Sequence, residues 1–296
     1  MYSDIAYDDA AVVRDYRVRY IAGKRGRIAP AAIKKFREII YGYYRKQKRD
    51  FPWRHTDDPY RILVSEVMLQ QTQTARVAEK YVEFIHAFPT LKALAAASLR
   101  DVMAVWRGMG YNRRARYLHE IARRIVKSPV GAIPEAPEEL ELLPGIGRAT
   151  AASICAFAFN RPVVFIETNI RAVFIHFFFN RRKSVSDREI LPLAEEALDR
   201  NEPRLWYSAL MDYGVMLKKR NPNPSRKSAH HQMQEPFKGS RRQVRGLVLR
   251  TLLDHTGITV RRLSLIIGRP EDEVASVVND LVAEALVRRK GRILSI

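Results

Sequence analysis

Two glutamates occupy settings in which a carboxyl group can do acid–base or electrostatic chemistry. The first, Glu66, lies in "PYRILVSEVMLQQTQTARVAEKYVEF", which has the apolar periodicity of one amphipathic helix. Spacings of three and four residues put it on one face with four neighbours, Ile62, Leu63, Leu69 and Gln70. Partial burial against apolar side chains raises the pKa of a carboxylic acid, so we expect Glu66 to hold a proton near neutral pH.

A turn with two glycines joins two predicted helices in "LELLPGIGRATAASI", residues 140 to 154. Gly145 and Gly147 flank one apolar residue, and a helix is predicted to begin at about Arg148. Backbone N–H groups beside a helix N-terminus form an anion site, and a helix-hairpin-helix uses them to hold a DNA phosphate without reading sequence. A plain helix–helix turn is the alternative. Pro144 and the basic character of the chain favour the phosphate site.

The second glutamate, Glu167, follows the apolar run "RPVVFI" and precedes the helical pattern "TNIRAVFIHFF". The positive end of a helix dipole favours an ionised carboxylate at this place. Taken alone, the segment fits a helix-capping acid equally well. Because it comes shortly after a hairpin that can hold DNA, the carboxylate can be aimed at the sugar of a bound nucleotide. There it would stabilise the oxocarbenium-like cation that forms when an N-glycosidic bond breaks.

The composition indicates a globular protein with a polyanionic partner. The chain has 296 residues, of which 47% are hydrophobic, and its 52 Lys and Arg against 32 acidic residues give a formal charge of +20. Nucleic acid is the commonest partner for such an excess, and a merely soluble basic surface is the alternative. Cys155 is the single cysteine, which excludes an intrachain disulfide, a zinc ribbon and a four-cysteine iron-sulfur cluster. The apolar runs are too short to span a bilayer, and we expect a cytoplasmic, nucleoid-associated protein without a membrane partner.

Helical periodicity dominates the chain, and we predict an all-α fold in four regions. Residues 1–28 form a basic N-terminal arm, and residues 29–217 form a helical core with short Gly, Pro and Asn breaks. Residues 218–239 are rich in Pro, Asn, Ser and positive charge, which predicts an extended basic linker. Residues 240–296 predict three helices followed by a hairpin with a Lys-Gly turn, the order of a winged helix-turn-helix. Any small three-helix unit gives a similar pattern.

Several of these motifs together resemble one family of DNA repair enzymes. "LPGIGRATAASI" followed by "FIETNIRAV" resembles the helix-hairpin-helix, Gly/Pro-rich-loop, aspartate (HhH-GPD) superfamily of base-excision DNA glycosylases. "FPWRHTDDPYRILVSEVMLQQTQ" and "WRGMGYNRRARYLH" are similar to its adenine branch, which removes adenine mispaired with oxidised guanine. The match covers roughly residues 30 to 217. It implies a two-lobed core with the active site in the cleft between the lobes, and a monomer acting on double-stranded DNA with a mismatch or lesion. No cofactor or metal is implied.

The resemblance also implies roles for individual residues. Glu66 matches the general acid that protonates the departing base. Glu167 would be the electrostatic stabiliser and a candidate base for water, and Asn169 would help to position that water. The run Gln70, Gln71, Thr72 and Gln73 falls where the family contacts bases and backbone of the opened duplex. In the loop "GMGYNRRAR", Met109 and Tyr111 would insert or stack when the base is flipped out. Phosphates would be held by Arg113, Arg114 and Arg116 and by the hairpin residues Gly145, Gly147 and Arg148. Solvated polar faces are the alternative for the glutamines and arginines.

Two departures from the family pattern fall in the expected active site. Glu167 stands where the superfamily has an aspartate, which keeps the charge and adds one carbon–carbon bond, about 1.5 Å of reach. Ala149 stands where lyase-competent members carry a lysine, and the neighbouring Arg148 is not a usable amine nucleophile. We therefore predict base removal without efficient strand cleavage.

Two further departures fall after the helical core. Most relatives carry four cluster-binding cysteines where this chain has "KKRNPNPSRKSAHHQ". We expect this loop to replace the structural role of the cluster and to present Lys218, Lys219, Arg220, Arg226 and Lys227 to phosphate. His230 and His231 lack further ligands at metal-binding spacing. With residues 240–296 after the linker, we do not expect the C-terminal domain with which the adenine branch recognises oxidised guanine.

Three alternatives therefore stay open at the level of the sequence. The chain could excise a different damaged or mismatched base, because Glu167 and Ala149 both alter the pocket. It could bind damaged or abasic DNA without catalysis, or it could be a winged-helix regulator. Retention of both carboxylates, Glu66 and Glu167, argues against pure binding.

Overall fold

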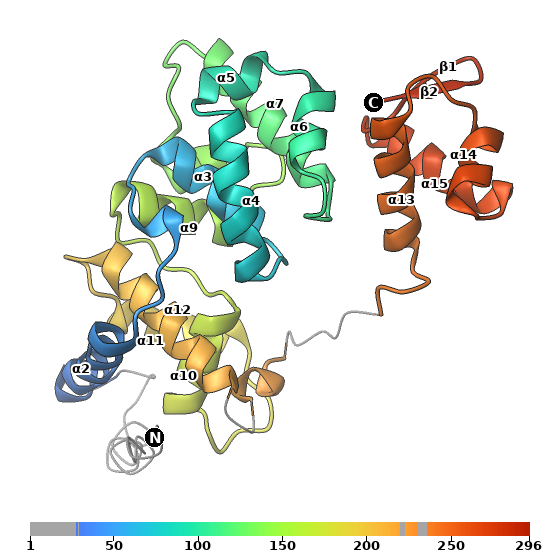
Figure 1. Ribbon diagram of the computed structural model, residues 1–296. Coiled ribbons are helices and arrows are strands. Elements are labelled where there is room, and N and C mark those ends of the chain that lie inside the picture. The colour runs from blue at the N-terminus through green and yellow to red at the C-terminus, as the bar shows by residue number, and fades with distance from the viewer. Residues whose placement is uncertain (1–27, 29, 220–222, 230–235) are drawn as a thin grey trace. The chain divides into compact units, whose positions relative to one another are not determined.

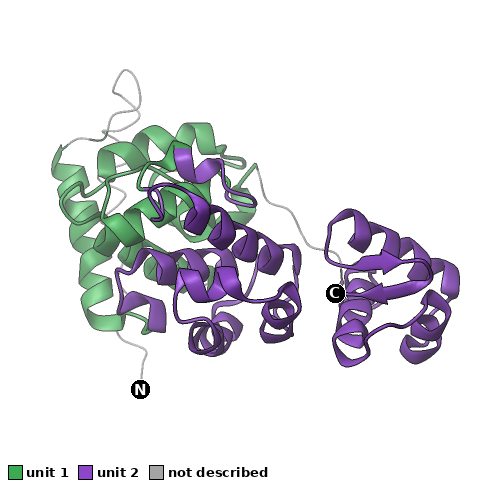
Figure 2. Ribbon diagram, turned by 90° about the horizontal axis from the view of Figure 1, so that it is seen from above, with its two compact units in different colours: residues 1–51, 135–138, 147–232 green, residues 52–134, 139–146, 233–296 purple. Residues whose placement is uncertain are grey.

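The computed structural model describes residues 28, 30–219, 223–229 and 236–296 (Figure 1). Most of the predicted N-terminal arm, together with Arg220, His230 and His231, lies outside these residues. The described residues are mainly helical and contain two short strands, which confirms the all-α prediction. The chain divides into two compact units, each made of stretches that are separate in the sequence (Figure 2). Unit 1 contains residues 1–51, 135–138 and 147–232, and unit 2 contains residues 52–134, 139–146 and 233–296.

The helices of unit 1 surround an apolar helix at its centre. These elements are α2 (Pro30–Gln47), α9 (Arg148–Phe159), α10 (Thr168–Phe178), α11 (Asp187–Ala197), α12 (Pro203–Lys219) and the 3-10 turn η2 (Pro224–Lys227). Helix α10 buries Ile170, Val173 and Phe174 completely and packs along α12. The ring of Phe36 from α2 meets Phe174, Phe177, Phe178 and Trp206 edge-on, with centroids 5.0–5.6 Å apart. Aromatic pairs in this geometry add to the stabilisation from buried area.

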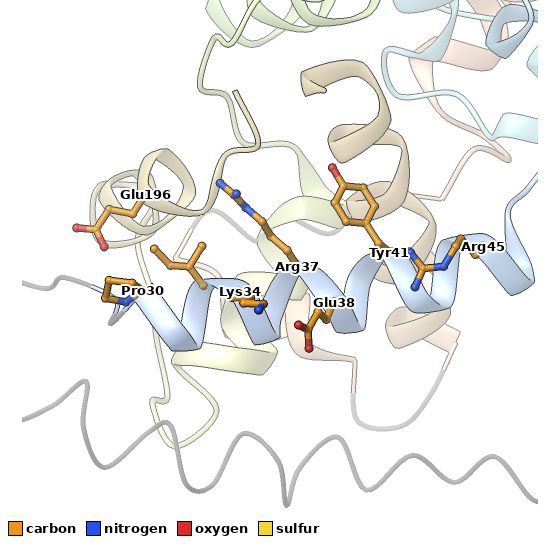
Figure 3. Close-up of a pocket in the computed structure, with 8 residues that line it drawn as sticks. Pro30, Lys34, Arg37, Glu38, Tyr41, Arg45 and Glu196 are labelled. Carbon is orange, nitrogen blue, oxygen red and sulfur yellow. The ribbon is translucent and has the colours of Figure 1, made fainter. Parts of the chain in front are cut away.

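Helix α2 is held on unit 1 by polar contacts at its outer edge. The guanidinium of Arg37 donates to the carbonyl oxygens of Ala197 (3.0 Å) and Leu198 (2.6 Å), just after α11, and Tyr41 donates to Asp199 at 2.8 Å. Figure 3 shows these side chains along α2, with Glu196 near its start beside a hollow of about 510 Å³. Arg37 satisfies carbonyl groups that the end of α11 leaves open. Arg37 and Tyr41, two of the polar residues of this hollow, therefore serve packing.

Residues 223–229 of the predicted linker are folded onto unit 1. The Val185 N–H donates to the carbonyl of Lys227 at 2.8 Å, and the Ala229 N–H donates to the carbonyl of Val185 at 2.9 Å. The ammonium group of Lys227 donates to the carbonyl of Asn180. Residues 223–229 thus pack beside α10 and are not an extended linker, because their backbone groups find partners in the loop before α11.

Unit 2 contains the remaining helices and the only strands in the described ranges. Its elements are η1 (Pro52–Arg54), α3 (Pro59–Leu69), α4 (Thr74–Ala87), α5 (Leu91–Ala96), α6 (Leu99–Val105), α7 (Arg113–Lys127), α13 (Arg241–Asp254), α14 (Val260–Ile267), α15 (Glu271–Ala283), β1 (Arg288–Lys290) and β2 (Ile293–Ser295). Helix α8 (Pro137–Glu141) crosses the boundary between the units. Strands β1 and β2 pair antiparallel around a turn in which Gly291 has a φ of +60°. Three helices and a hairpin with a Lys-Gly turn are the elements predicted for residues 240–296.

Candidate functional site

Glu167 caps the N-terminus of α10. Its Oε1 accepts hydrogen bonds from the N–H groups of Asn169 (2.7 Å) and Ile170 (2.9 Å), and its Oε2 accepts one from Asn169 Nδ2 at 3.1 Å. Two of the four N–H groups that a helix start leaves open are satisfied in this way. The side chain is partly buried. Burial raises the pKa of Glu167, while the hydrogen bonds and the nearby charge of Lys218 lower it. The predicted position at a helix start is confirmed.

Helix α12 fixes this helix start by a close backbone contact. A Cβ atom built on Gly214 would lie 2.3 Å from the carbonyl oxygen of Asn169, a distance that no side chain tolerates. The glycine therefore permits α12 and the first turn of α10 to approach more closely than any other residue would. Lys218 lies one helical turn after Gly214 on the same side of α12. The same contact thus brings a cationic side chain toward the carboxylate of Glu167.

Lys218 is partly buried and interacts electrostatically with Glu167. Burial lowers the pKa of Lys218, the charge of Glu167 raises it, and the charge of Arg49 lowers it. Arg49 is itself bound to a completely buried carboxylate, because its N–H and Nε donate to Asp212 at 2.8 and 2.6 Å. Burying an ionised group is unfavourable unless opposite charges or hydrogen bonds accompany it. The surroundings of Glu167 provide both.

Asn169 offers a second polar group beside this carboxylate. Its Nδ2 donates to Glu167, and its Oδ1 is buried without a hydrogen-bond donor among the described residues. A buried acceptor without a protein partner is a place where a bound water is expected. Asn169 therefore offers one acceptor oxygen without a protein donor next to the carboxylate of Glu167.

Glu66 lies in the interior of α3, between the buried residues Ser65 and Val67. Ile62 and Leu63, one turn earlier on the same face, are also buried. Glu66 itself is partly buried, as its spacing predicted. Its protonation near neutral pH stays a prediction.

The glutamine-rich run after Glu66 does not continue the helix. A single helix through residues 65–84 was the wrong prediction, because α3 ends at Leu69 and α4 begins at Thr74. Gln71, with a φ of +53°, lies in the left-handed region, which ends the helix. Gln70 donates from Nε2 to the carbonyl of Gly145 at 3.2 Å, so the turn contacts the two-glycine hairpin. Gln71 and Gln73 are exposed.

Arg114, predicted to hold phosphate, is instead buried beneath this turn. Its guanidinium donates to the carbonyls of Val67 (3.0 Å), Met68 (2.8 Å) and Gln70 (2.5 Å) and to the hydroxyl of Thr72 (2.8 Å). Only 5% of the residue is exposed. The carbonyls at the end of α3 lack helical partners, and Arg114 supplies them. Its role is therefore to shape the Gln turn, defined here as residues 70–73.

In the loop before α7, the two residues predicted to insert or stack, Met109 and Tyr111, differ in exposure. Met109 is 2% exposed and packs in the core, so in this structure it is not placed to insert between bases. Gly108 and Gly110, with φ values of +90° and +70°, turn the backbone on either side of it. Tyr111 is 37% exposed and accepts a hydrogen bond from Arg242 at 3.4 Å. Tyr111 is thus the exposed aromatic side chain of this loop, and the guanidinium of Arg114 lies over its ring.

The two remaining arginines of this segment lie on α7. Arg113 is exposed, and its Nε lies 3.9 Å from a carboxylate oxygen of Glu284. Arg116 pairs with Glu120 at 3.2 Å, and its guanidinium lies over the ring of Tyr117. Their contacts with phosphate stay predictions.

The two-glycine hairpin has the geometry that its sequence predicted. Gly145 has a φ of +76°, and a Cβ at this position would lie 2.4 Å from the ring of Tyr117. Ile146 is buried and anchors the turn, while Gly147 is the N-cap of α9 and contributes no side chain. Arg148 and Ala149 are exposed in the first turn of α9. The N-terminus of α9 is therefore open to an anion.

Comparison with known proteins identifies the region that carries these features. Residues 64–198 match the HhH-GPD superfamily of base excision DNA repair proteins. These residues form an HhH-GPD domain. The matched segment includes Glu66, the Gln turn, the hairpin and the helix start at Glu167.

Curated relatives of the HhH-GPD domain bear the name adenine DNA glycosylase. The human protein is 35% identical over an alignment of 197 positions that covers 62% of this chain and 36% of that protein. The protein of Mycobacterium tuberculosis is 41% identical over 135 residues, 45% of this chain and 44% of that protein. The Schizosaccharomyces pombe protein is 32% identical over an alignment of 209 positions that covers 62% of this chain and 45% of that protein. The chain thus spans between a third and a half of these relatives.

Solved structures carry the same fold. A thermostable thymine-DNA glycosylase is 25% identical with a TM-score of 0.57, over 65% of this chain and 90% of that protein. Endonuclease III, solved in a non-covalent complex with DNA, has a TM-score of 0.56 at 19% identity, over 66% of this chain and 90% of that protein. The second likeness concerns the fold alone.

Sequence reasoning missed the electrostatic interaction of Lys218 with Glu167, which involves a residue outside the matched segment. Lys218 was predicted to face phosphate together with Lys219, and only Lys219 is fully exposed. The glycine at position 214 could have given a signal, because a glycine inside a helical pattern often marks a close backbone approach. Within the described residues no cluster of His, Cys, Asp or Glu is suited to a metal, and no helix there is long and apolar enough to cross a membrane.

Proposed function

We propose that the protein is a base-excision DNA glycosylase that hydrolyses the N-glycosidic bond of adenine mispaired with 8-oxoguanine or guanine in double-stranded DNA. The observation that carries the proposal is the Glu167–Asn169 pair at the start of α10, inside the HhH-GPD domain. The adenine DNA glycosylases among the relatives support the choice of base.

The chemistry divides between a proton donor and an anion. Glu66, partly buried among apolar residues of α3, would donate a proton to the adenine ring and make the base a neutral leaving group. Loss of the base leaves a cationic sugar, which the ionised Glu167 would stabilise. A water held by Asn169 Oδ1 would attack the anomeric carbon and give its proton to Glu167. The products are free adenine and an abasic site.

The hairpin and the Gln turn would position the DNA. The open N-terminus of α9 at Gly147 would hold one phosphate of the backbone. Gln71 and Gln73 are exposed and would meet the bases around the lesion, with Tyr111 filling the space of the extruded nucleotide. Gln70 ties the turn to the hairpin, so these two contacts would share one rigid base.

We further propose that base removal is not followed by efficient strand cleavage. Ala149 occupies an exposed place in the first turn of α9 and offers no amine. Schiff-base chemistry needs a neutral amine as nucleophile. Lys218 is an amine that interacts electrostatically with Glu167; burial lowers its pKa and so favours the neutral amine, while the charge of Glu167 opposes this effect. Cleavage without alkali treatment would therefore point to Lys218.

The test is single-turnover base release on duplexes that carry adenine opposite 8-oxoguanine or guanine, with and without alkali. Uracil, hypoxanthine and an alkylated base serve as control substrates. We expect release of adenine and breaks that appear only after alkali. Binding to mismatched duplex without release of any base would contradict an enzymatic function and indicate a reader of damaged DNA.

Excision of a different base is the second candidate function. It is favoured by Glu167, which reaches farther than the family aspartate, and by the likeness to a thymine-DNA glycosylase at 25% identity. The same assay separates the two candidates, because one of the control substrates would then react faster than adenine.

A further inference from the structure

The C-terminal helices and hairpin carry their charges in an unusual distribution. In a helix-turn-helix the second helix enters the major groove of DNA, and here that helix is α15. Its first turn contains Glu271, Asp272 and Glu273, and its sequence contains no Lys or Arg. Three carboxylates at this end would repel phosphate. Helix α15 is therefore a poor candidate for binding DNA.

The cations lie on the hairpin instead. All three residues of β1, Arg288, Arg289 and Lys290, are exposed. They line one side of a hollow of about 1270 Å³ within unit 2, and α7 lines the other side with Arg116, Arg123, Arg124 and Lys127. We call this hollow, with these seven cations, the basic groove. Neither α3 nor the Gln turn contributes to it.

The basic groove keeps most of its positive charge uncompensated. Glu120 is its one acidic side chain, and it pairs with Arg116 at 3.2 Å and with Arg124. Among the residues that the structure describes, no carboxylate forms an ion pair with Arg123, Lys127 or the three cations of β1. Like charges gathered at this density are unfavourable unless an anion joins them.

Contacts inside unit 2 hold the two walls of the groove together. The guanidinium of Arg100, at the start of α6, donates to the carbonyls of Leu252 (3.1 Å) and Leu253 at the end of α13. Arg107 pairs with Asp254 at 2.6 Å. These bonds satisfy carbonyls that the end of α13 leaves open. The cations of α7 and β1 thus form one surface.

We propose that the basic groove binds the phosphodiester backbone of duplex DNA. The C-terminal hairpin would then add affinity together with α7, and the acidic first turn of α15 would stay outside the groove. The five N–H donors of an arginine guanidinium suit the oxygens of backbone phosphates. Binding to phosphates does not depend on the base sequence of the DNA. This inference extends the proposed function, because it concerns undamaged DNA and does not depend on base release.

The experiment measures binding of the full chain to a short undamaged duplex by fluorescence anisotropy over a range of salt concentrations. One double variant, R288Q/R289Q, changes the hairpin wall, and a second, R123Q/K127Q, changes the α7 wall. We expect each to weaken binding about tenfold or more at low salt. The slope of log affinity against log salt should fall by about 0.9 for each lost phosphate contact.

The matched control is R261Q/R262Q, which removes the same two charges from exposed positions of α14 outside the groove. It should leave affinity and salt slope close to those of the wild type. A loss as large as that of R288Q/R289Q would overturn the proposal, since net charge alone would then explain binding. Unchanged binding in both wall variants would overturn it as well.

One further variant and one competition experiment also test the proposal. Glu120→Gln releases Arg116 and Arg124 from their carboxylate and should tighten binding, and weaker binding in this variant would count against the groove. Competition with millimolar nucleoside triphosphate tests whether the groove prefers a free phosphate ligand, and full displacement of the duplex would contradict a DNA site. Because the duplex is undamaged, these results stand even if the wild type releases no base.

Discussion

The start of α10 and the end of α3 fix polar functional groups in opposite ways. At the start of α10, Glu167 caps its own helix through the N–H groups of Asn169 and Ile170. At the end of α3, the carbonyls of Val67, Met68 and Gln70 are bound by Arg114, 44 to 47 residues later in the chain. One end is organised by a local side chain, and the other by a residue far away in the sequence.

This difference explains which features the sequence could predict. A cap is a local pattern, so an acid between an apolar run and a helical run predicted the position of Glu167. The end of α3 depends on a tertiary contact that has no local signal. The apolar spacing alone therefore predicted one helix that continued through the Gln turn. Substitutions at Glu167 and at Arg114 test this difference between the two helix ends.

The largest effect is expected from removing the two carboxylates. Glu66→Gln deletes the proton donor and should slow single-turnover base release by about 10²- to 10⁴-fold. Glu167→Gln keeps an oxygen that accepts the cap hydrogen bonds and deletes the charge, so it should slow release while the helix start stays folded. Both variants should bind mismatched duplex almost as well as the wild type. Base release by Glu66→Gln at the wild-type rate would remove Glu66 from the mechanism.

Arg114 should show the next largest effect, on stability. Arg114→Met leaves several buried carbonyls without a donor, and each such group costs roughly 1–3 kcal/mol. We expect the free energy of unfolding, measured in urea, to fall by about 3 kcal/mol or more. The exposed neighbour gives the control, since Arg113→Met should change stability by no more than about 0.5 kcal/mol. Equal effects in the two variants would contradict the structural role of Arg114.

Substitution of two helical glycines by alanine is expected to change stability in opposite directions. Gly214→Ala puts a methyl group 2.3 Å from the Asn169 carbonyl oxygen, and overpacking of this kind costs about 1–3 kcal/mol. Gly246→Ala, in α13, meets no atom within 4 Å and should raise stability by about 0.5–1 kcal/mol through helix propensity. Thermal unfolding measures both. Base release should also fall in Gly214→Ala, because the clash displaces Asn169.

The sequence predicted the elements of the site better than its long-range contacts. The hairpin at Gly145 and Gly147 and the cap at Glu167 follow from turn and capping chemistry, and both are confirmed. Met109 and Arg114 were predicted to face DNA and are buried, because charge and size alone do not show which side of a loop faces the core. The approach of Lys218 to Glu167 depends on the packing of α12 on α10, which only the folded chain establishes.

The charge of Lys218 is expected to tune the pH dependence of base release. Burial raises the pKa of Glu167, so its ionised form is lost as the pH falls through that raised value, and activity should decline on the acid side. By the same linkage, the folded state binds the proton more tightly than the unfolded chain. Stability therefore rises as the pH falls through the folded pKa. Lys218 opposes the effect of burial by favouring the carboxylate.

Lys218→Met should therefore raise the pKa of Glu167 further and move the acid limb of the rate profile to higher pH. The other charges near the carboxylate stay in place: Arg171 remains paired with Asp187 at 2.6 Å, and Arg49 remains bound to Asp212. Lys219→Met, next in the chain and exposed, removes the same charge and should leave the acid limb where it is. Single-turnover rates across pH measure the shift. If the acid limb does not move in Lys218→Met, the hydrogen bonds of Asn169 and Ile170 alone keep Glu167 ionised. The charge state of the cap would then depend only on residues next to Glu167 in the sequence.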